Sequence, residues 1–182
     1  TDYADLCLNG CTIMSWVNVK NVVDGEIVAR FNNAATKNFL RLGFDDDFDR
    51  ITFLLSEDGE VSDCTSYTSI GTFPKNTWVH VAAIYDDETN QTSVYLDGEQ
   101  DVFENCGFDQ INLTKWQQSQ NTYIGTRTSS STEKFNGTLD EVMIFSRALS
   151  PEEINATYNA SKYRLFNNFT NLTDGDYPVK AY

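Results

Sequence analysis

Histidine and basic residues are scarce in this chain of 182 residues, and both shortages narrow what it can do. His80 is the single histidine. It falls within a predicted strand, which argues against a Ser-His-Asp catalytic set. Thirteen Lys and Arg stand against 27 Asp and Glu, giving a formal net charge of −14. Such a chain repels phosphate backbones, so we expect no nucleic acid partner.

Long apolar runs are missing as well. No stretch approaches the roughly 20 apolar residues of a membrane helix, so we expect no membrane span in this chain. The sequence begins at Thr1 without a signal peptide, as a processed or recombinant fragment would. Hydrophobic residues make up 40% and aromatic residues 13% of the chain, enough to fill the core of one all-β sandwich followed by a tail.

Short runs of alternating apolar and polar residues recur along the chain, with turn-forming pairs such as Asp24-Gly25 and Asp97-Gly98 between them. Regularly spaced strands separated by turn signals are typical of an antiparallel sandwich. The predicted strands cover residues 12–20, 26–31, 38–44, 50–56, 64–70, 77–85, 91–96, a segment after 98, and 122–125.

The segment 135–158 (FNGTLDEVMIFSRALSPEEINATY) organises the rest of the chain. Within it, residues 139–146 alternate as a strand does, and the strand is predicted to stop at Leu149. Both faces of this strand are largely apolar toward its end, which predicts that it is covered on both sides.

A short helix is predicted directly after this strand. Ser150 is a suitable N-cap, Pro151 then takes the first helical position, and Glu153 completes a capping box. Ile154 and Tyr158 are four residues apart and share one helix face. We expect these two side chains to hold the helix against the edge of the sheet.

Three segments carry a family resemblance. They are GxLDEVxIFxRALSxEEI at 137–154, TIMSWV at 12–17, and TWVHVA at 77–82 together with VYLDG at 94–98. In this order they resemble the laminin-G-like (concanavalin A-like) jelly-roll family over roughly residues 3–162. The resemblance implies an all-β, two-sheet antiparallel jelly-roll sandwich with one short C-terminal helix, in a domain of residues 1–162. It leaves function open, because this fold hosts lectins, adhesion modules, pentraxins and glycosidases.

Residues 163–182 follow the predicted domain. The part NLTDGDY at 171–177, with Val179 and Tyr182 after it, resembles the start of an immunoglobulin-like or fibronectin-like module that is cut short. Two alternatives remain: a terminal strand that pairs with a neighbouring sheet edge and allows self-association, and a frayed tail.

Four cysteines are present, Cys7, Cys11, Cys64 and Cys106, and four cysteines allow three pairings. Cys7 and Cys11 flank Leu8-Asn9-Gly10, a natural tight loop, so we predict that they pair with each other. Cys64 and Cys106 would then join two later segments of the sandwich. A zinc site would need more closely paired thiolates and usually histidine, so disulfides are favoured.

Seven Asn-x-Ser/Thr sequons are present, whereas 17 Asn residues would give about three by chance. Together with disulfides they favour an N-glycosylated protein that is extracellular or at the cell surface. The alternative is a turn composition rich in Asn and Thr. The predicted attachment sites are Asn90, Asn112, Asn136, Asn155, Asn159, Asn168 and Asn171.

Asp45, Asp47 and Asp49 alternate between two predicted strands. On an extended strand they would share a face, and retaining glycosidases need two carboxylates that flank the scissile bond. Here all three are aspartates, where glycosidases of this fold use a Glu-x-Asp-x-Glu strand, and they fall at a probable hairpin tip. We therefore expect no enzyme. Asp45 and Asp47 could instead bind a ligand or calcium, or form a solvated turn.

Asp140 is a second possible calcium site. Related sandwiches often place a structural calcium at an aspartate at this point of the last strand, so the resemblance implies Asp140 as a metal ligand, with calcium as the one expected cofactor. The alternative is that Asp140 pairs with Arg147 or caps a turn. Trp116 lies in a polar segment and could stack on a sugar ring or pack over the sandwich edge, whereas Trp16 and Trp78 are expected in the core.

From these features we predict a non-catalytic extracellular binding or adhesion module that recognises a glycan or a surface protein through its rim loops. A structural subunit of a surface layer or filament, with residues 163–182 docked onto a neighbour, is the first alternative. A glycoside hydrolase of the same fold is the second.

Overall fold

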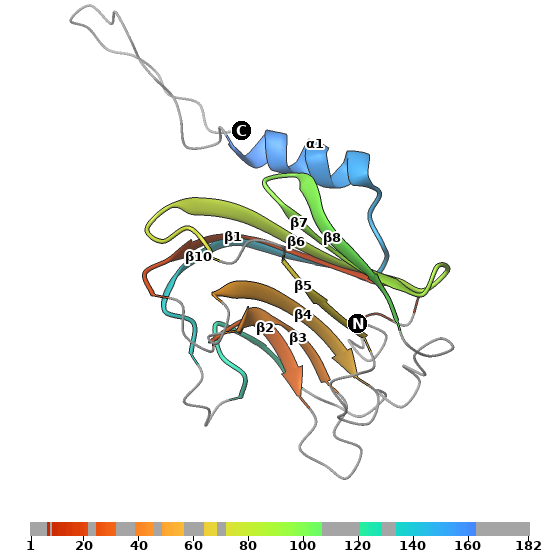
Figure 1. Ribbon diagram of the computed structural model, residues 1–182, viewed down its shortest axis with the longest axis horizontal. Helices are drawn as coiled ribbons and strands as arrows, with labels where there is room; N and C mark the ends of the chain where they lie inside the picture. The colour runs from red at the N-terminus through yellow and green to blue at the C-terminus, as the bar shows by residue number, and fades with distance from the viewer. Residues whose placement is uncertain are drawn as a thin grey trace, which may run out of the picture.

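Two antiparallel five-stranded sheets stack face to face, and one helix lies over the outer face of the first sheet (Figure 1). The computed structural model describes residues 7, 9–21, 25–31, 39–45, 49–56, 64–68, 72–106, 121–128 and 134–162. This arrangement confirms the predicted antiparallel sandwich. None of the described residues forms a helix long and apolar enough to cross a membrane.

The first sheet has the strand order β10-β1-β6-β7-β8 and the second has the order β5-β4-β3-β2-β9. The first sheet contains β10 (Gly137–Phe145), β1 (Cys11–Val19), β6 (Trp78–Asp86), β7 (Gln91–Leu96) and β8 (Glu99–Asn105). The second contains β5 (Cys64–Tyr67), β4 (Arg50–Ser56), β3 (Phe39–Asp45), β2 (Gly25–Phe31) and β9 (Thr122–Ile124). The predicted strands are confirmed with ends shifted by at most two residues, with two exceptions. The strand β5 stops at Tyr67 rather than at residue 70, and β10 stops at Phe145 rather than at Leu149.

Alternating side chains fill the space between the two sheets, because successive residues of a strand point to opposite faces. Val81, Ala83 and Tyr85 of β6 belong to the same fully buried cluster as Leu40 and Leu42 of β3. The opposite set of alternating residues therefore faces outward on each sheet. On the first sheet α1 covers part of this outer face, where Met14, Ala82 and Tyr95 are buried.

Both predicted disulfides are confirmed. Cys7 pairs with Cys11, and Cys64 pairs with Cys106, with Cα–Cα distances of 4.5 and 4.6 Å. Cys64 begins β5 in the second sheet, whereas Cys106 follows β8 in the first, so this bond joins the two sheets. All four thiols are consumed, which leaves none to bind zinc.

The strand β10 lies at one edge of the first sheet, next to β1. As predicted, side chains pack on both of its faces: Val142 and Ile144 pack against the core between the sheets, and Met143 and Phe145 against a second cluster beneath the helix. These side chains are half-buried rather than buried, since an edge strand has a neighbour on one side only.

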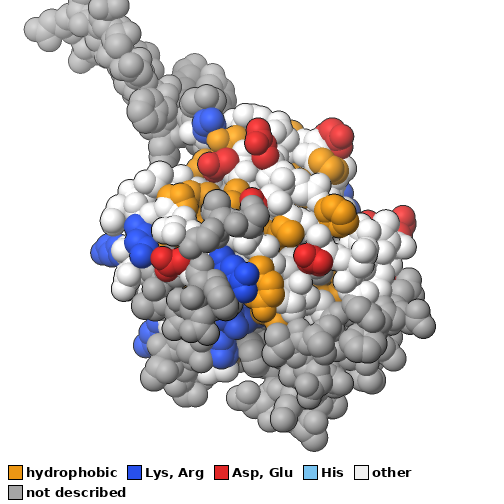
Figure 2. Space-filling view, viewed as in Figure 1, with side chains coloured by type: hydrophobic (Ala, Val, Ile, Leu, Met, Phe, Trp, Pro, Cys, Tyr) orange, Lys and Arg blue, Asp and Glu red, His pale blue; other side chains and the backbone are white. Residues whose placement is uncertain are grey.

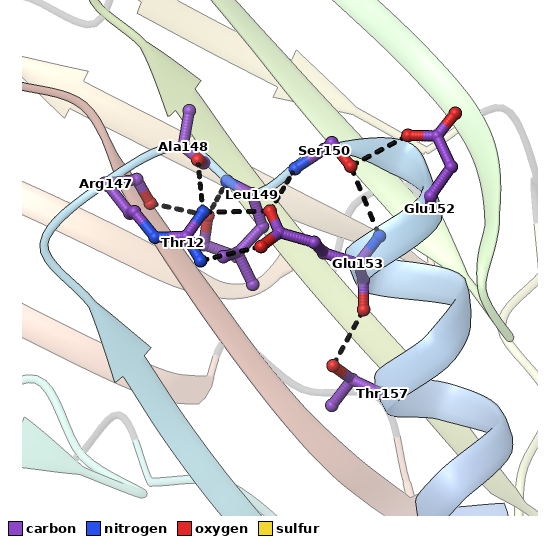
Figure 3. Close-up of polar contacts among 8 residues, drawn as sticks. All are labelled: Thr12, Arg147, Ala148, Leu149, Ser150, Glu152, Glu153 and Thr157. Carbon is purple, nitrogen blue, oxygen red and sulfur yellow. Dashed lines mark hydrogen bonds and ion pairs between the residues drawn. The ribbon is translucent and has the colours of Figure 1, made fainter.

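The helix α1 (Pro151–Lys162) begins with the predicted capping box (Figure 3). The Glu153 N–H donates to Ser150 Oγ over 3.3 Å, and the Ser150 N–H donates to Glu153 Oε2 over 2.9 Å. Ile154 is fully buried, and the Tyr158 ring lies 5.7 Å from that of Trp16 in β1. The helix thus contacts central strands as well as the predicted sheet edge.

The prediction of a core role for Trp78 is wrong, because this side chain is 42% exposed. It precedes the buried Val79 at the start of β6, so the strand alternation directs it away from the second sheet. Trp16 is half-buried under α1 rather than between the sheets.

Candidate functional site

The outer face of the second sheet carries a group of charged and aromatic side chains that we call the arginine face. It consists of Glu26, Arg41, Arg50, Tyr67 and Arg127. The first four come from β2, β3, β4 and β5, and Arg127 follows β9. In β3 and β4 these residues alternate with the buried residues of the core, which is why they face outward.

Glu26 is the centre of the arginine face. Its side chain is fully buried, and it contacts two guanidinium groups. Arg41 Nε lies 2.8 Å from Glu26 Oε1, and Arg127 approaches the same oxygen through Nε at 2.9 Å and Nη2 at 2.8 Å. Burial raises the pKa of the Glu26 carboxyl, and the charges of Arg41 and Arg127 act in the opposite direction.

Gly43 makes this arrangement possible. In the ladder it lies opposite Glu26 in β2 and Thr52 in β4. A Cβ atom at position 43 would overlap Glu26 Oε2 and would lie 2.8 Å from the carbonyl oxygen of Gly25. The missing side chain therefore lets the Glu26 carboxylate lie across β3 and reach Arg41, whose Nη2 also donates to the Phe44 carbonyl over 2.9 Å.

The other end of the arginine face is aromatic. The guanidinium carbon of Arg50 lies 3.8 Å from the centroid of the Tyr67 ring, a cation–π arrangement. Thr52 lies between Gly43 and Tyr67 in the ladder. It is 2% exposed, and its Oγ1 has no hydrogen-bond partner in the described part of the chain. An unpaired buried hydroxyl costs about 1–3 kcal/mol, and this one lies beneath the surface of the arginine face.

The arginine face carries three guanidinium groups and one carboxylate, in a chain whose net charge is −14. The Arg41 and Arg127 side chains remain 18% and 21% exposed, so both reach solvent. In Figure 2, several Lys and Arg side chains lie over the region where Figure 1 places the second sheet, and several carboxylates lie near α1.

The predicted ligand residues lie only partly within the described structure. Asp45 is the last residue of β3 and pairs with Arg50 in the ladder, which places it at one end of the arginine face. Asp47 and Trp116 lie outside the described residues. Asp49 forms an ion pair with Lys75 at 3.4 Å.

Asp140, the predicted calcium ligand, accepts a hydrogen bond from the Glu141 N–H over 2.8 Å. Its backbone carbonyl accepts one from Ser15 Oγ over 3.1 Å. Arg147 pairs with Glu153. The described residues contain no group of three His, Cys, Asp or Glu that could hold a metal ion, and a calcium site at Asp140 stays a prediction.

Four of the seven sequons fall on described residues. Asn136, Asn155 and Asn159 are exposed, and the last two lie on α1. Asn90 is half-buried, and its side-chain oxygen lies 3.4 Å from the Tyr85 hydroxyl, which donates to it. Asn112, Asn168, Asn171 and residues 163–182 lie outside the described part of the chain.

Sequence reasoning missed the arginine face. An arginine at an alternating strand position, two residues before a glycine, is the local signal at Arg41. That signal does not reveal that Arg127, 101 residues after Glu26, contacts the same carboxylate.

Comparisons with solved structures give low identities over most of the chain. The CBM40 module of the Ruminococcus gnavus IT-sialidase bound to α2,3-sialyllactose matches with 16% identity and a TM-score of 0.67, over 82% of this chain and 83% of that one. A proposed carbohydrate binding protein from Bacteroides ovatus matches with 20% identity and a TM-score of 0.59. That match covers 81% of this chain and 40% of the Bacteroides protein.

The same fold occurs within enzymes. A Trypanosoma rangeli sialidase matches over 86% of this chain but only 23% of its own length, with 19% identity and a TM-score of 0.59. No curated protein matches the chain. A family model described as the concanavalin A-like lectin/glucanases superfamily matches residues 1–155. The chain therefore belongs to the concanavalin A-like lectin/glucanase superfamily, as the resemblance predicted.

Proposed function

We propose that this protein is a non-catalytic glycan-binding module and that its arginine face binds a sugar bearing a carboxylate. The observation that carries the proposal is the pair of guanidinium groups held by the buried Glu26. Guanidinium groups bind carboxylates through paired, charge-assisted hydrogen bonds. Their fixed positions reduce the entropy that is lost on binding.

The neighbouring groups suit the rest of a sugar. Tyr67, whose ring lies against the Arg50 guanidinium, offers its remaining aromatic surface to the apolar face of a pyranose. One structural neighbour supports this ligand class. The CBM40 module of the Ruminococcus gnavus IT-sialidase is described as bound to α2,3-sialyllactose and to α2,6-sialyllactose, and the sialic acid of both sugars carries a carboxylate.

The carboxylate count supports binding rather than hydrolysis. A retaining glycosidase needs two carboxyl groups roughly 5–5.5 Å apart. Among the described side chains of the arginine face, Glu26 is the one carboxylate, and Arg41 and Arg127 already occupy it. A nucleophile that is neutralised in this way would be a poor one.

The setting we propose is extracellular or at the cell surface. Two disulfides suit an oxidising compartment, and exposed sequons such as Asn136 suit N-glycosylation. We place the binding domain at residues 1–162, as the sequence predicted.

Isothermal titration calorimetry with 3′-sialyllactose and with lactose tests the proposal, because the two sugars differ by the sialic acid. We expect wild-type protein to prefer sialyllactose, and Arg127→Ala to weaken its binding tenfold or more, since a hydrogen bond to a charged group contributes about 1.5–3 kcal/mol. Arg127→Lys should lie in between, because it keeps the charge but not the paired geometry.

Lys162→Ala is the matched control, since it removes one positive charge from α1, on the other side of the sandwich. It should leave the affinity unchanged. Equal affinity for the two sugars, or an unchanged affinity in a folded Arg127→Ala variant, would show that the arginine face does not bind acidic glycans.

A further inference from the structure

A hollow lies on the outer face of the first sheet, beside the start of α1. We call it the helix groove. Its volume is about 440 Å³, within the range of small-molecule sites. Its floor includes Ile84 of β6 with Ser93 and Tyr95 of β7, and its walls are the turn 86–89 and the segment 147–151. The arginine face lies on the opposite side of the sandwich.

Tyr95 gives the helix groove an unused polar group. Its side chain is only 4% exposed and lines the groove, yet its hydroxyl makes no hydrogen bond to any described residue. The hydroxyl is not among the fully buried polar atoms that lack a partner, so it reaches the groove, where a ligand could contact it. Burial, together with the nearby charge of Glu152, raises the pKa of Tyr95, so the hydroxyl is a neutral donor. Ser93 lies two residues earlier on the same face of β7, with its Cα about 7 Å away along the strand, and adds a second hydroxyl to the groove.

One wall of the helix groove is held firmly in place. Thr12 Oγ1, which is buried, donates to the Arg147 carbonyl and accepts from the Leu149 N–H, both over 2.9 Å. The Arg147 guanidinium donates to both carboxylate oxygens of Glu153, at 2.8 and 2.7 Å. Figure 3 shows these contacts joining β1, the segment 147–150 and the first turn of α1.

The opposite wall is equally fixed. The carboxylate of Asp86 accepts hydrogen bonds from the Glu88 N–H over 3.0 Å and from Thr89 Oγ1 over 2.9 Å. Both walls are therefore organised before any ligand enters, which lowers the entropic cost of binding.

The charges around the helix groove select the ligand. Asp86 and Glu88 line it, and the one lining cation, Arg147, is already paired with Glu153. An acidic ligand would be repelled by this balance. The groove combines hydroxyls, a carboxylate acceptor and the apolar surfaces of Ile84 and Leu149, a mixture that suits the hydroxyls and the C–H face of a sugar ring.

We propose that the helix groove is a second saccharide site, for an uncharged sugar. The helix groove shares no residue with the arginine face. With one site on each side of the sandwich, a single module could hold two glycans of different charge at once.

The test is NMR titration of the isotope-labelled protein with the methyl glycosides of galactose, glucose, mannose and N-acetylglucosamine, each at about 10 mM, which exceeds a 1 mM Kd tenfold. At least one sugar should bind and shift the amide signals of Ser93, Tyr95 and Leu149. Tyr95→Phe keeps the ring and removes only the hydroxyl, and it should weaken binding about fivefold, as should Ser93→Ala.

Tyr123→Phe is the matched control, because it removes the same atom from β9 of the other sheet, and it should leave this binding unchanged. The proposal is overturned if none of the four sugars binds. It is equally overturned if the shifts map elsewhere, or if folded Tyr95→Phe and Ser93→Ala variants bind as tightly as wild type. None of these results bears on sialyllactose binding at the arginine face.

Discussion

His80 makes the stability of this protein depend on pH. Its side chain is fully buried, and neither ring nitrogen has a hydrogen-bond partner in the described part of the chain. Its ring packs against those of Trp16 and Tyr158, with centroid distances of 5.4 and 5.7 Å, and these two rings also contact each other. Burial lowers the pKa of His80 from 6.5 to about 4, although the charges of Asp97 and Glu141 act in the opposite direction.

The direction of the effect follows from proton binding. In the unfolded chain the imidazole takes up a proton below about pH 6.5, whereas in the folded protein it does so only near pH 4. Between these values the unfolded state binds more protons, so the free energy of unfolding falls as the pH falls. The shift from 6.5 to about 4 corresponds to a total loss of about 3 kcal/mol, of which about 2 kcal/mol is lost between about pH 7 and pH 5.

Urea denaturation of wild type and His80→Leu at about pH 7 and pH 5 measures the pH-dependent contribution of His80 to the free energy of unfolding. The leucine variant keeps an apolar group of similar size but cannot titrate, and carboxylates contribute equally to both proteins. We expect wild type to lose about 2 kcal/mol more than the variant between these pH values. The same pH dependence in both proteins would refute the assignment to His80, which is the single histidine of the chain.

Three further variants test the disulfide between the sheets, the role of Gly43 and the cap of α1. Replacing Cys64 and Cys106 by serine opens a loop whose ends are 42 residues apart and should lower the free energy of unfolding by about 4 kcal/mol in chemical denaturation; a loss below about 1 kcal/mol would contradict this. Gly43→Ala should displace Glu26 and weaken sialyllactose binding at least tenfold by calorimetry, whereas unchanged affinity would show that Glu26 does not organise the site. Ser150→Ala removes the N-cap of α1 and should cost about 1 kcal/mol, and an unchanged melting temperature would argue against the capping box.

Local sequence patterns predicted the strands and the start of α1. The capping box at Ser150 and Glu153 depends on residues three apart, and the strand alternation depends on residues two apart, so both can be read without knowing the fold. The pairing of Cys7 with Cys11 was readable for the same reason. The order of segments that resemble the family supplied the larger arrangement.

The binding surfaces depend on contacts between distant parts of the chain. Glu26 meets Arg127 across 101 residues, and the Thr12 hydroxyl reaches the Arg147 carbonyl across 135. Contacts between residues so far apart in the sequence cannot be predicted from local patterns. The exposure of Trp78 was missed for a different reason. Strand alternation places Trp78 and Val79 on opposite faces of β6, but which face meets the second sheet depends on the fold.

The central claim is that acidic glycans bind on the outer face of the second sheet. NMR shift mapping with 3′-sialyllactose, using amides assigned along β2, β3 and β4, tests it most directly. We predict saturable shifts that concentrate at Glu26, Arg41 and Gly43, with little change along β6 and β7. Shifts confined to the first sheet or to the rim loops, or no shifts at a sugar concentration of about 10 mM, would contradict the account.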